Sequence, residues 1–489
     1  MKIIALYPST GLDKEKASIG LPLSLLHAFS KVVKAGYKVR IIDQRLGKQW
    51  RKTLINEFEN NEIVYAGIPS MTGKQLAGTA DAAKLIKKIS KKTPIILGGI
   101  HASLLPAQTL NNRYIDIVVM GEGEITLLEL TERLVNRREL EELRGVAYKT
   151  HSGRVIINEQ REFMDINETI DIPYDLVNVQ DYYLNLYGSK KTLSLQVGRG
   201  CPHRCNYCYN TVYSKRKWRS ISAEEMFNKV TLLKEFGAES VDLVDDNYFT
   251  NIKRVEKFIQ LMESEKIDMK FLTNIRIDYL AKYNTNFLKK LKKAGFKEFF
   301  IGVETGSETV ANYIKKDMNV NDVTEVNVKL RKCGIKPIYS FMVGFPGEKM
   351  EDINKTIDLM VRLKKDNPTS SLTSLKVFTP YPGTGLYDIC IKNGFKPPET
   401  IEEWSEFNYN YSGFSFRSKK LSQLMEKLSY MTYFLDNKSM VKHVGGNPLL
   451  NLLIRIYSCI VLLRCKTHFY CFMPEIPIMK FFHHKIFKK

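Results

Sequence analysis

The stretch "GRGCPHRCNYCYN", residues 198–210, brings Cys201, Cys205 and Cys208 together in a chain that contains eight cysteines. Thiolates at the spacing C-x3-C-x2-C can converge on one metal centre when the loop between them is tightly wound, and iron–sulfur cubanes are held by such thiolates. Zinc sites favour four ligands, commonly in two C-x2-C pairs, and His203 lies at an offset that suits them poorly. Three sulfurs on a four-iron cubane leave one iron open to a substrate or cofactor. The stretch therefore predicts a cluster with a coordination vacancy.

Outward from this loop, residues 191–418 repeat a strand and helix pattern in six successive steps. Short runs rich in β-branched residues alternate there with amphipathic stretches. Such a series predicts an incomplete, TIM-like (β/α)6 barrel, in which chemistry lies at the carboxyl ends of the strands. The expected strands are 192–200, 240–246, 269–276, 298–304, 336–346 and 371–383, and the expected helices are 223–237, 252–264, 286–295, 322–334 and 352–365.

Residues 1–144 have the α/β pattern of an open, doubly wound (Rossmann-like) domain. Most of their strand-like runs are nearly continuous apolar stretches, as parallel strands buried on both faces are. Proteins of this architecture bind ligands beyond the carboxyl ends of the strands. In this sequence, loops of small residues follow the expected strands at those ends. Residues 145–190 contain an expected hairpin and then a segment rich in Asp and Asn without a sustained period, which predicts a linker. The expected strands of the domain are 2–8, 37–43, 62–68, 93–99 and 115–121, and the expected helices are 21–36 and 76–92.

Residues 419–489 are predicted to form a small helical region with an amphipathic, basic end. Within "NPLLNLLIRIYSCIVLLRC", Asn451, Arg455 and Ser458 form a polar stripe on an otherwise apolar helix. A membrane span needs about 20 apolar residues, and Arg455 interrupts this segment. Two interpretations stay open: a helix that lies on an anionic bilayer surface, and a helix that covers the barrel. The basic residues that follow are Arg464, Lys466, Lys480, Lys485, Lys488 and Lys489.

The composition is that of a folded protein with an overall positive charge. At 489 residues the chain is too long for one ordinary core, and 44% hydrophobic with 26% charged residues exclude a disordered chain. The net charge of +21 comes from lysines spread along the sequence, so no specific nucleic-acid stripe is expected. The opening "MKIIALYPST" lacks a secretory pattern. We therefore predict a cytoplasmic protein with free thiols, with peripheral attachment to the inner face of the membrane as an open alternative.

The cysteine stretch and the segments after it resemble the radical SAM superfamily. Its signature has an aromatic residue before the last cysteine, here Tyr207, and "VDLVDDNYFTN", "TNIRIDYL", "FFIGVETGSETV", "FMVGFPGE" and "FTPYPGTGLY" follow in the expected order. The resemblance implies that the three cysteines bind a [4Fe-4S] cluster whose open iron is chelated by S-adenosyl-L-methionine. It also implies cofactor contacts from Asp245, Asp246, Arg276, Glu304 and Ser307, with the forked guanidinium of Arg276 suited to a carboxylate.

A doubly wound domain ahead of such a barrel resembles the cobalamin-binding subgroup of that superfamily. The segments "GIPSMTG", "LGGIHASLLP" and "DIVVMGEGEITLLEL" are similar to its cofactor loops. Many cobalamin domains place a cobalt-binding histidine in a D-x-H-x-x-G motif, but "YPSTGLDKEKASIG" contains no histidine. We expect cobalamin without a histidine from that motif on cobalt, and a domain that no longer binds the cofactor is the alternative. The implied cobalamin contacts are Ser70, Thr72, Gly73, Gly98, Gly99, His101, Gly121 and Glu122.

The resemblance implies an enzyme that generates a 5′-deoxyadenosyl radical and methylates an unactivated carbon of a small-molecule or lipid-linked substrate. Two S-adenosylmethionine molecules would serve, one as radical source and one to remethylate the cobalt, with an electron donor such as flavodoxin or ferredoxin. A cobalamin-dependent radical cyclase or rearrangement enzyme, as in anaerobic tetrapyrrole ring closure, is the alternative within the superfamily. Methylthiolation is less favoured because no cysteine precedes Cys201. A basic scaffold that binds membranes or nucleic acid is the alternative of a different class.

Overall fold

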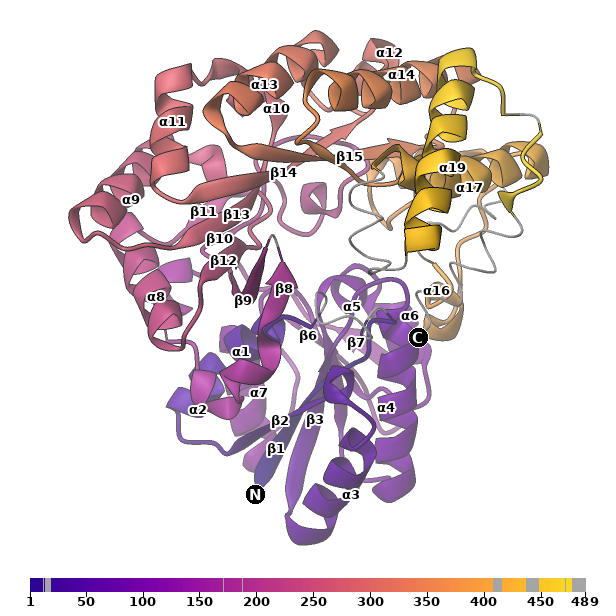
Figure 1. Cartoon of the computed structure of the whole chain (residues 1–489). Coiled ribbons are helices and arrows are strands. Elements are labelled where there is room, and N and C mark those ends of the chain that lie inside the picture. The colour runs from indigo at the N-terminus through magenta and orange to yellow at the C-terminus, as the bar shows by residue number, and fades with distance from the viewer. Residues whose placement is uncertain are drawn as a thin grey trace.

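The computed structural model describes residues 1–11, 13, 19–169, 171–186, 188–407, 416–436, 448–470 and 472–476. Two α/β bodies face one another, and the last helices lie at one side of the second body (Figure 1). Lys480, Lys485, Lys488 and Lys489, on which part of the C-terminal prediction depends, lie outside the described residues.

The first body is built on a seven-stranded sheet of order β2-β1-β3-β4-β5-β6-β7. The five strands from β1 to β5 run parallel, as the sequence predicts, and β6 and β7 are antiparallel. The strands are β1 (Lys2–Tyr7), β2 (Val39–Asp43), β3 (Ile63–Pro69), β4 (Ile95–Gly98), β5 (Ile117–Val119), β6 (Val146–Lys149) and β7 (Val155–Ile157).

Helices cover both faces of this sheet because successive side chains of each strand point to opposite sides. Ile3 and Ala5 of β1 pack toward α1, α2 and α7, whereas Ile4 and Leu6 pack toward α3, α4, α5 and α6. The doubly wound prediction is therefore confirmed. The helices are α1 (Leu23–Ala28), α2 (Ser30–Lys34), α3 (Trp50–Asn60), α4 (Gln75–Ile89), α5 (Ile100–Leu104), α6 (Pro106–Asn111) and α7 (Glu124–Val135).

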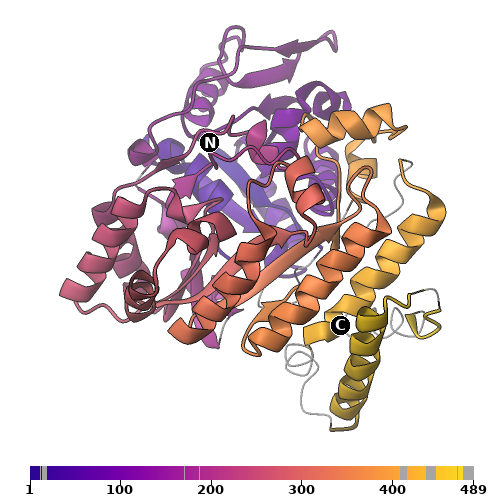
Figure 2. The ribbon, with the colours of Figure 1, turned by 90° about the horizontal axis from the view of Figure 1, so that it is seen from above.

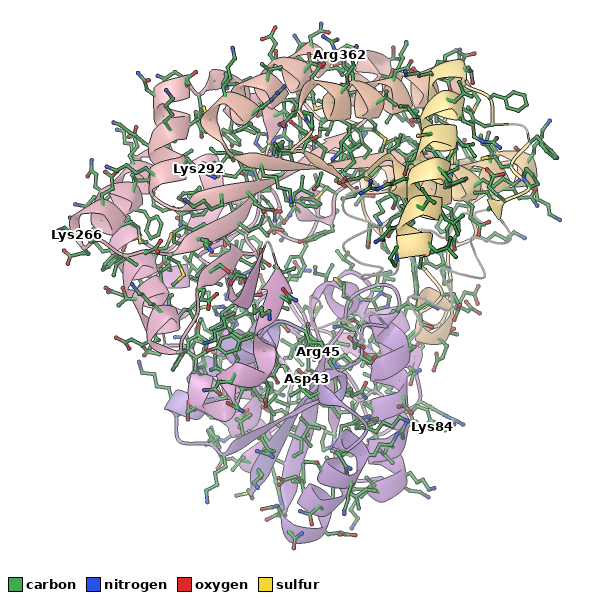
Figure 3. The ribbon with its side chains drawn as sticks, viewed as in Figure 1. Asp43, Arg45, Lys84, Lys266, Lys292 and Arg362 are labelled. Carbon is green, nitrogen blue, oxygen red and sulfur yellow. The ribbon has the colours of Figure 1, made fainter. Side chains whose placement is uncertain are left out.

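The expected hairpin after residue 145 forms, but it belongs to the first sheet. Strand β6 pairs with β5, whose backbone would otherwise form an exposed edge. The rest of the predicted linker runs through short 3-10 helices, and Tyr182 in one of them donates to Asp43, 3.2 Å away. Asp43 and Arg45 form a buried ion pair of 2.7 Å at this point (Figure 3). The segment is thus fastened to the first body.

The second body is an incomplete barrel, as predicted. Strands β9, β12, β13, β14, β15 and β16 pair in parallel, in that order, and their helices lie on the outer side (Figure 1). The expected last strand is split into two short pieces that both pair with β15. The strands are β8 (Leu184–Leu186), β9 (Ser189–Leu195), β10 (Gly198–Arg199), β11 (Arg219–Ser220), β12 (Ser240–Leu243), β13 (Lys270–Ile275), β14 (Phe296–Glu304), β15 (Lys336–Val343), β16 (Ser371–Leu372) and β17 (Lys376–Val377).

The barrel helices follow the predicted periodicity, with two short additions, α10 and α12, at strand ends. Several begin at a side-chain cap, for example Ser222 on α8 and Asn251 on α9. The helices are α8 (Ala223–Glu235), α9 (Ile252–Ser264), α10 (Ile277–Lys282), α11 (Thr285–Lys293), α12 (Glu308–Tyr313), α13 (Val320–Cys333) and α14 (Met350–Asp366).

The chain then returns to the first body before it ends on the barrel. Helix α16 (Ile401–Trp404) packs on α4, and the Trp404 indole donates to Gln108, 2.7 Å away. After α15 (Gly385–Lys392) and α16, helix α17 (Lys419–Thr432) packs on β17 and on residues 433–436, and helix α19 (Pro448–Thr467) packs beside α14. Part of the predicted barrel range 191–418 therefore holds the two bodies together.

Positive charge is distributed over the whole molecule. Lys84 on α4, Lys266 after α9 and Arg362 on α14 are exposed on different sides of it (Figure 3). This distribution agrees with the general basicity inferred from the sequence, and these side chains form no single basic stripe.

Candidate active site

The cysteine loop leaves the barrel at the carboxyl end of β9. Strands β10 and β11 pair antiparallel and close the intervening residues into a loop. Gly200 has a φ of 80°, and a Cβ atom there would collide with the carbonyl of Lys217, so glycine is required at this turn. Cys205 is buried, Cys201 and Cys208 are half-buried, and all three are free thiols.

The three thiols of the loop do not form a ready site for a single ion. In the described part of the chain, no group of three or more His, Cys, Asp or Glu side chains surrounds one metal position. A cubane takes one sulfur on each of several irons, so its ligands stand farther apart than those of tetrahedral zinc. Burial raises the pKa of the Cys208 thiol to about 12 and also raises the pKa of Cys201. To ionise, these thiols need positive charge nearby, which the iron ions of a bound cluster would supply.

Arg276 reaches the cysteine loop from outside it. One terminal nitrogen lies 3.3 Å from Cys205 Sγ, the other donates to the Lys316 carbonyl, and Nε donates to Asp278 at 2.7 Å. Arg276 follows β13 directly, so the strand aims it at the loop. The structure thus brings the predicted Arg276 to the predicted cluster site.

Glu304 and Tyr207 also meet beneath the loop. Glu304 ends β14 with a φ of 71°, a left-handed conformation that is costly for a residue with a side chain. Its carboxylate accepts from Lys316 Nζ at 3.1 Å and from the Tyr207 hydroxyl at 3.3 Å. Burial, with the nearby Glu304 charge, raises the pKa of Tyr207 well above its usual value. This polar cluster lies beside the cysteines and can orient a charged cofactor.

Asp245 and Asp246 follow β12 and support the loop from behind. Asp245 is fully buried, accepts from the Val197 amide at 2.7 Å, and has a pKa raised to about 7 by burial. Asp246 accepts from the Gly200 amide at 3.0 Å and from the Tyr209 hydroxyl at 2.7 Å. Asp246 therefore holds both ends of the cysteine segment.

Ser307 is a predicted contact that the structure places in a helix cap. Its hydroxyl accepts from the Val310 amide of α12 and donates to Asp352, 2.6 Å away, and the residue is fully buried. The hydroxyl is already bonded on both sides, and it lines neither the loop nor the cavity described next. The interpretation of Ser307 as a cofactor ligand is not supported by this position.

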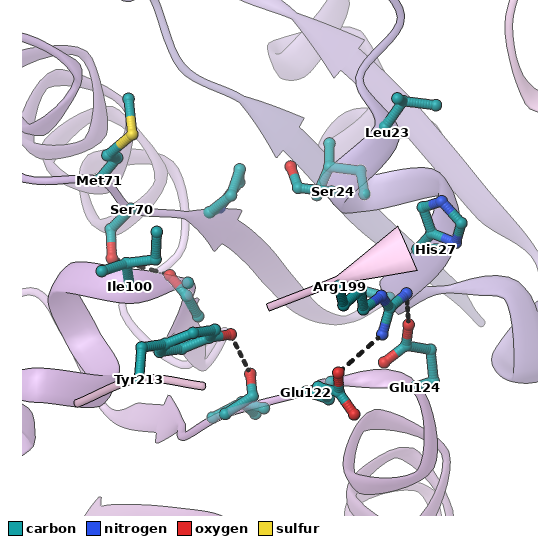
Figure 4. A pocket seen from close by; sticks show the side chains of 18 of the residues that line it. Leu23, Ser24, His27, Ser70, Met71, Ile100, Glu122, Glu124, Arg199 and Tyr213 are labelled. Atoms are coloured by element: carbon teal, nitrogen blue, oxygen red, sulfur yellow. Dashed lines mark hydrogen bonds and ion pairs between the residues drawn. The ribbon is translucent and has the colours of Figure 1, made fainter. Parts of the chain in front are cut away.

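A cavity of about 390 Å³ lies between the two bodies (Figure 4). The first body contributes the predicted residues Ser70, Gly98, Gly99, Gly121 and Glu122, and the barrel contributes Gln196, Arg199, Tyr209, Tyr213 and Asp246.

An apolar part of the cavity wall is formed by the sheet of the first body and by α1 and α7. Gly67 on β3 and Phe29 face this part, and a Cβ atom on Gly67 would come within 2.8 Å of the Phe29 ring. Gly99 has a φ of 92°, and a Cβ atom there would lie 2.7 Å from the Ser70 carbonyl oxygen. A side chain at Gly67 or Gly99 would therefore displace the neighbouring residues of the cavity wall. A cavity lined by both apolar and polar residues suits an amphipathic cofactor such as cobalamin.

Thr72, Gly73 and His101 lie outside this cavity. His101 is fully buried, with Nδ1 3.0 Å from the Thr72 hydroxyl and its ring edge-on to Trp404. Burial lowers the pKa of His101 to about 4. Gly73 faces the Phe407 carbonyl. These three predicted residues support the contact with the α16 segment instead of lining the cavity.

The sequence prediction missed a charge network that joins the two bodies across the cavity. Arg199 pairs with Glu124 at 2.5 Å and with Glu122 at 3.2 Å (Figure 4). Arg219 pairs with Glu122 at 2.7 Å. These side chains are mostly buried. The position of Arg199, two residues before Cys201, indicated that it lies near the cysteine loop. Its partners Glu122 and Glu124 are far away in the chain, so the sequence did not predict the pairs. The network couples the cysteine loop to the first body.

Comparison with known proteins agrees with this geometry. The radical SAM superfamily profile matches residues 195–360, and the B12 binding domain profile matches residues 19–131. The chain contains a B12-binding domain followed by a radical SAM domain. These matches confirm the predicted family and cofactor set, and the cysteine loop and most of the residues that line the cavity fall within the two matched regions.

Relatives of this radical SAM protein cover most of its length. An uncharacterised methyltransferase of Pyrococcus horikoshii is 27% identical over 91% of this chain and 95% of its own. An anaerobic magnesium-protoporphyrin IX monomethyl ester cyclase of Synechocystis is 24% identical over 80% of this chain and 77% of its own. The solved structure of the cobalamin-dependent S-adenosylmethionine radical enzyme OxsB with aqua-cobalamin has a TM-score of 0.76 at 17% identity, over 100% of this chain and 76% of that one. The fold is thus that of cobalamin-dependent radical SAM enzymes.

Proposed function

We propose that this radical SAM protein is a cobalamin-dependent methyltransferase that places a methyl group on an unactivated carbon of a small molecule. The observation that carries the proposal is a wall shared by the two sites. Tyr209 and Asp246 line the cavity, and Asp246 also binds the cysteine loop. A cofactor in the cavity would therefore adjoin the cluster site, and the relative named a methyltransferase supports this use of it.

The residues present fit both cofactors. Cys201, Cys205 and Cys208 would hold the cluster, and Arg276 and Glu304 would orient S-adenosylmethionine by its charged ends. Ser70 and Gly99 would hold cobalamin at the first body. When bound, these groups supply one-electron hydrogen abstraction and a transferable methyl group. The chain itself supplies their placement and the exclusion of water between the two bodies.

The direct test uses S-adenosylmethionine with a trideuteriomethyl group. Anaerobically reconstituted protein, cobalamin, a reductant and a cell metabolite extract would be incubated together and analysed by mass spectrometry. We expect 5′-deoxyadenosine and a product that carries the deuterated methyl group. Deoxyadenosine with a product that lacks the label would contradict methyl transfer.

A radical cyclase is the second candidate, favoured by the similarity to the Synechocystis cyclase. The same labelled experiment separates the two functions, because ring closure consumes the radical but incorporates no methyl group. A product lighter by lost hydrogen atoms, without label, would identify cyclisation.

We further propose that an acidic one-electron carrier, such as a flavodoxin, docks at the cysteine loop. Lys215, Arg216 and Lys217 are exposed on this loop. Arg216 Nε also donates to the carbonyl of Pro202, 3.2 Å away, so its charge lies directly over the loop. Complementary charges of this kind raise association rates at low salt.

Reversing these charges is expected to slow reduction of the cluster by a reduced flavodoxin by about tenfold or more at low salt. The variant is K215E/R216E/K217E, and stopped-flow absorbance measures the rate. Reduction by dithionite, which needs no docking surface, should be unchanged. The matched control K84E/K88E/K92E reverses three exposed charges on the far side of the first body and should behave as wild type. An unchanged flavodoxin rate in the loop variant would exclude this surface.

A further inference from the structure

Helix α19 has one face packed on the barrel and one face in water. Ile454, Ser458, Val461 and Cys465 are buried, and the helix contacts α14 and the segment Tyr433–Asp436. The outward face carries large apolar side chains at helical spacing. They are Leu452 (53% exposed), Leu453 (53%), Ile456 (51%), Ile460 (43%) and Leu463 (63%).

The predicted polar stripe therefore does not form one side of the helix. Ser458 is buried, and its hydroxyl donates to the Ile454 carbonyl, 2.8 Å away, whereas Arg455 is exposed beside the apolar face. Phe469 and Phe472, just beyond the helix, are 51% and 66% exposed and extend the apolar area. The helix lies at the outer edge of the molecule (Figure 2). A soluble monomer rarely exposes so many large apolar side chains in one place, so the face indicates an interaction surface.

Charge identifies the occupant of this surface. Helix α19 contains no Asp or Glu, and Arg455 and Lys466 are exposed on it. A second copy of the chain also carries a net charge of +21, and the general repulsion between two such copies disfavours this contact. An anionic lipid bilayer instead attracts the cations and accepts the apolar side chains.

The same residues indicate how the helix would lie. Among the described helices α19 alone is long and apolar enough to cross a membrane by length and composition. Its inner face, however, packs against α14, and Arg455 interrupts its apolar length. A helix held along the protein in this way can enter only the surface layer of a bilayer.

We propose that α19 docks the protein on an anionic bilayer, with its axis along the surface and its Leu and Ile face among the lipid chains. Docking in this position would bring the enzyme to membrane-borne substrates. That extension to lipid-linked substrates rests on the proposed function, whereas docking itself does not. This proposal combines the two interpretations that the sequence left open for the helix. One face of α19 covers the barrel, and the other face would contact lipid.

The test is flotation of the full-length protein with vesicles of phosphatidylcholine, with and without phosphatidylglycerol. We expect binding to the anionic vesicles that weakens in high salt. The face variant L452Q/L453Q/I456Q/L463Q should bind at least about tenfold more weakly. The control L46Q/I55Q/V328Q/I391Q changes four exposed apolar residues elsewhere and should bind as wild type. Circular dichroism and size-exclusion chromatography confirm that both variants fold.

A charge variant separates the two contributions. R455Q/K466Q should lose the preference for anionic vesicles while the apolar face is unchanged. Retained binding in the face variant would overturn the proposal. So would a wild-type dimer that ignores vesicles and becomes monomeric in the face variant, because the face would then be a self-association surface. Vesicle binding is measured without turnover, so its outcome is independent of the proposed methyl transfer.

Discussion

Replacing Cys205 with alanine is expected to remove the iron–sulfur absorbance and all measurable formation of 5′-deoxyadenosine. Cys205 is the most buried of the three loop cysteines, and its sulfur lies 3.3 Å from the Arg276 guanidinium. Two remaining thiolates hold a cubane poorly, because each missing sulfur leaves another iron open to water. Visible absorbance and Mössbauer spectra of anaerobic, iron-reconstituted protein measure the cluster, and chromatography measures deoxyadenosine.

Cys390→Ala is the matched control for this change. Cys390 is also a buried, free thiol, but it packs in an apolar cluster with Phe395 and Trp404. A buried free cysteine away from a metal acts as a small apolar side chain, so this variant should keep the absorbance and the activity. Stoichiometric zinc in the wild-type loop, or full absorbance in Cys205→Ala, would contradict the assignment.

Arg199→Met is expected to destabilise the protein by about 3–5 kcal/mol, because it leaves Glu124 as a buried carboxylate without its partner. Glu124 is 2% exposed, and its side chain pairs with Arg199 at 2.5 Å. The variant should unfold at a lower temperature and bind cobalamin more weakly, since Arg199 also lines the cavity. Calorimetry and cobalamin titration measure the two effects.

Two further variants test the cause of this loss. Arg199→Met with Glu124→Gln removes the stranded charge and should be more stable than Arg199→Met alone. Arg144→Met breaks a pair with Glu159 in which the side chains are 61% and 72% exposed, and it should change stability by less than about 1 kcal/mol. If Arg199→Met were as mild as Arg144→Met, the charge network would not join the two bodies.

Much of the fold follows from periodicity that is visible in the sequence. The runs at 2–8 and 62–68 are apolar except at Lys2 and Glu62, as expected for β1 and β3, which are covered by helices on both faces. The predicted linker shows where periodicity fails. Strand β6 is too short to show a burial pattern, and its place in the first sheet depends on the open edge of β5.

Some of the candidate cofactor residues could likewise be predicted from the sequence, and others could not. Glycines at special backbone positions were predictable, since Gly99 has a left-handed φ and a neighbour at its missing Cβ. Thr72 and His101 have the same loop chemistry in sequence, yet both lie outside the cavity, where Thr72 contacts His101 and the His101 ring packs edge-on to Trp404. The direction of a side chain at the end of a strand depends on the residues that pack against it. Here those residues come from the segment near residue 404, which is distant in the chain.

By itself the sequence determined the three-cysteine loop, the order of two α/β bodies and the family, because cysteine spacing and buried periodicity are properties of neighbouring residues. Only the tertiary structure decided that Asp246 binds the cysteine loop, that Arg199 meets Glu124 across the cavity, and that the outer face of α19 stays exposed. These contacts join residues that are remote in the chain, and their energy depends on burial, which exists only after folding.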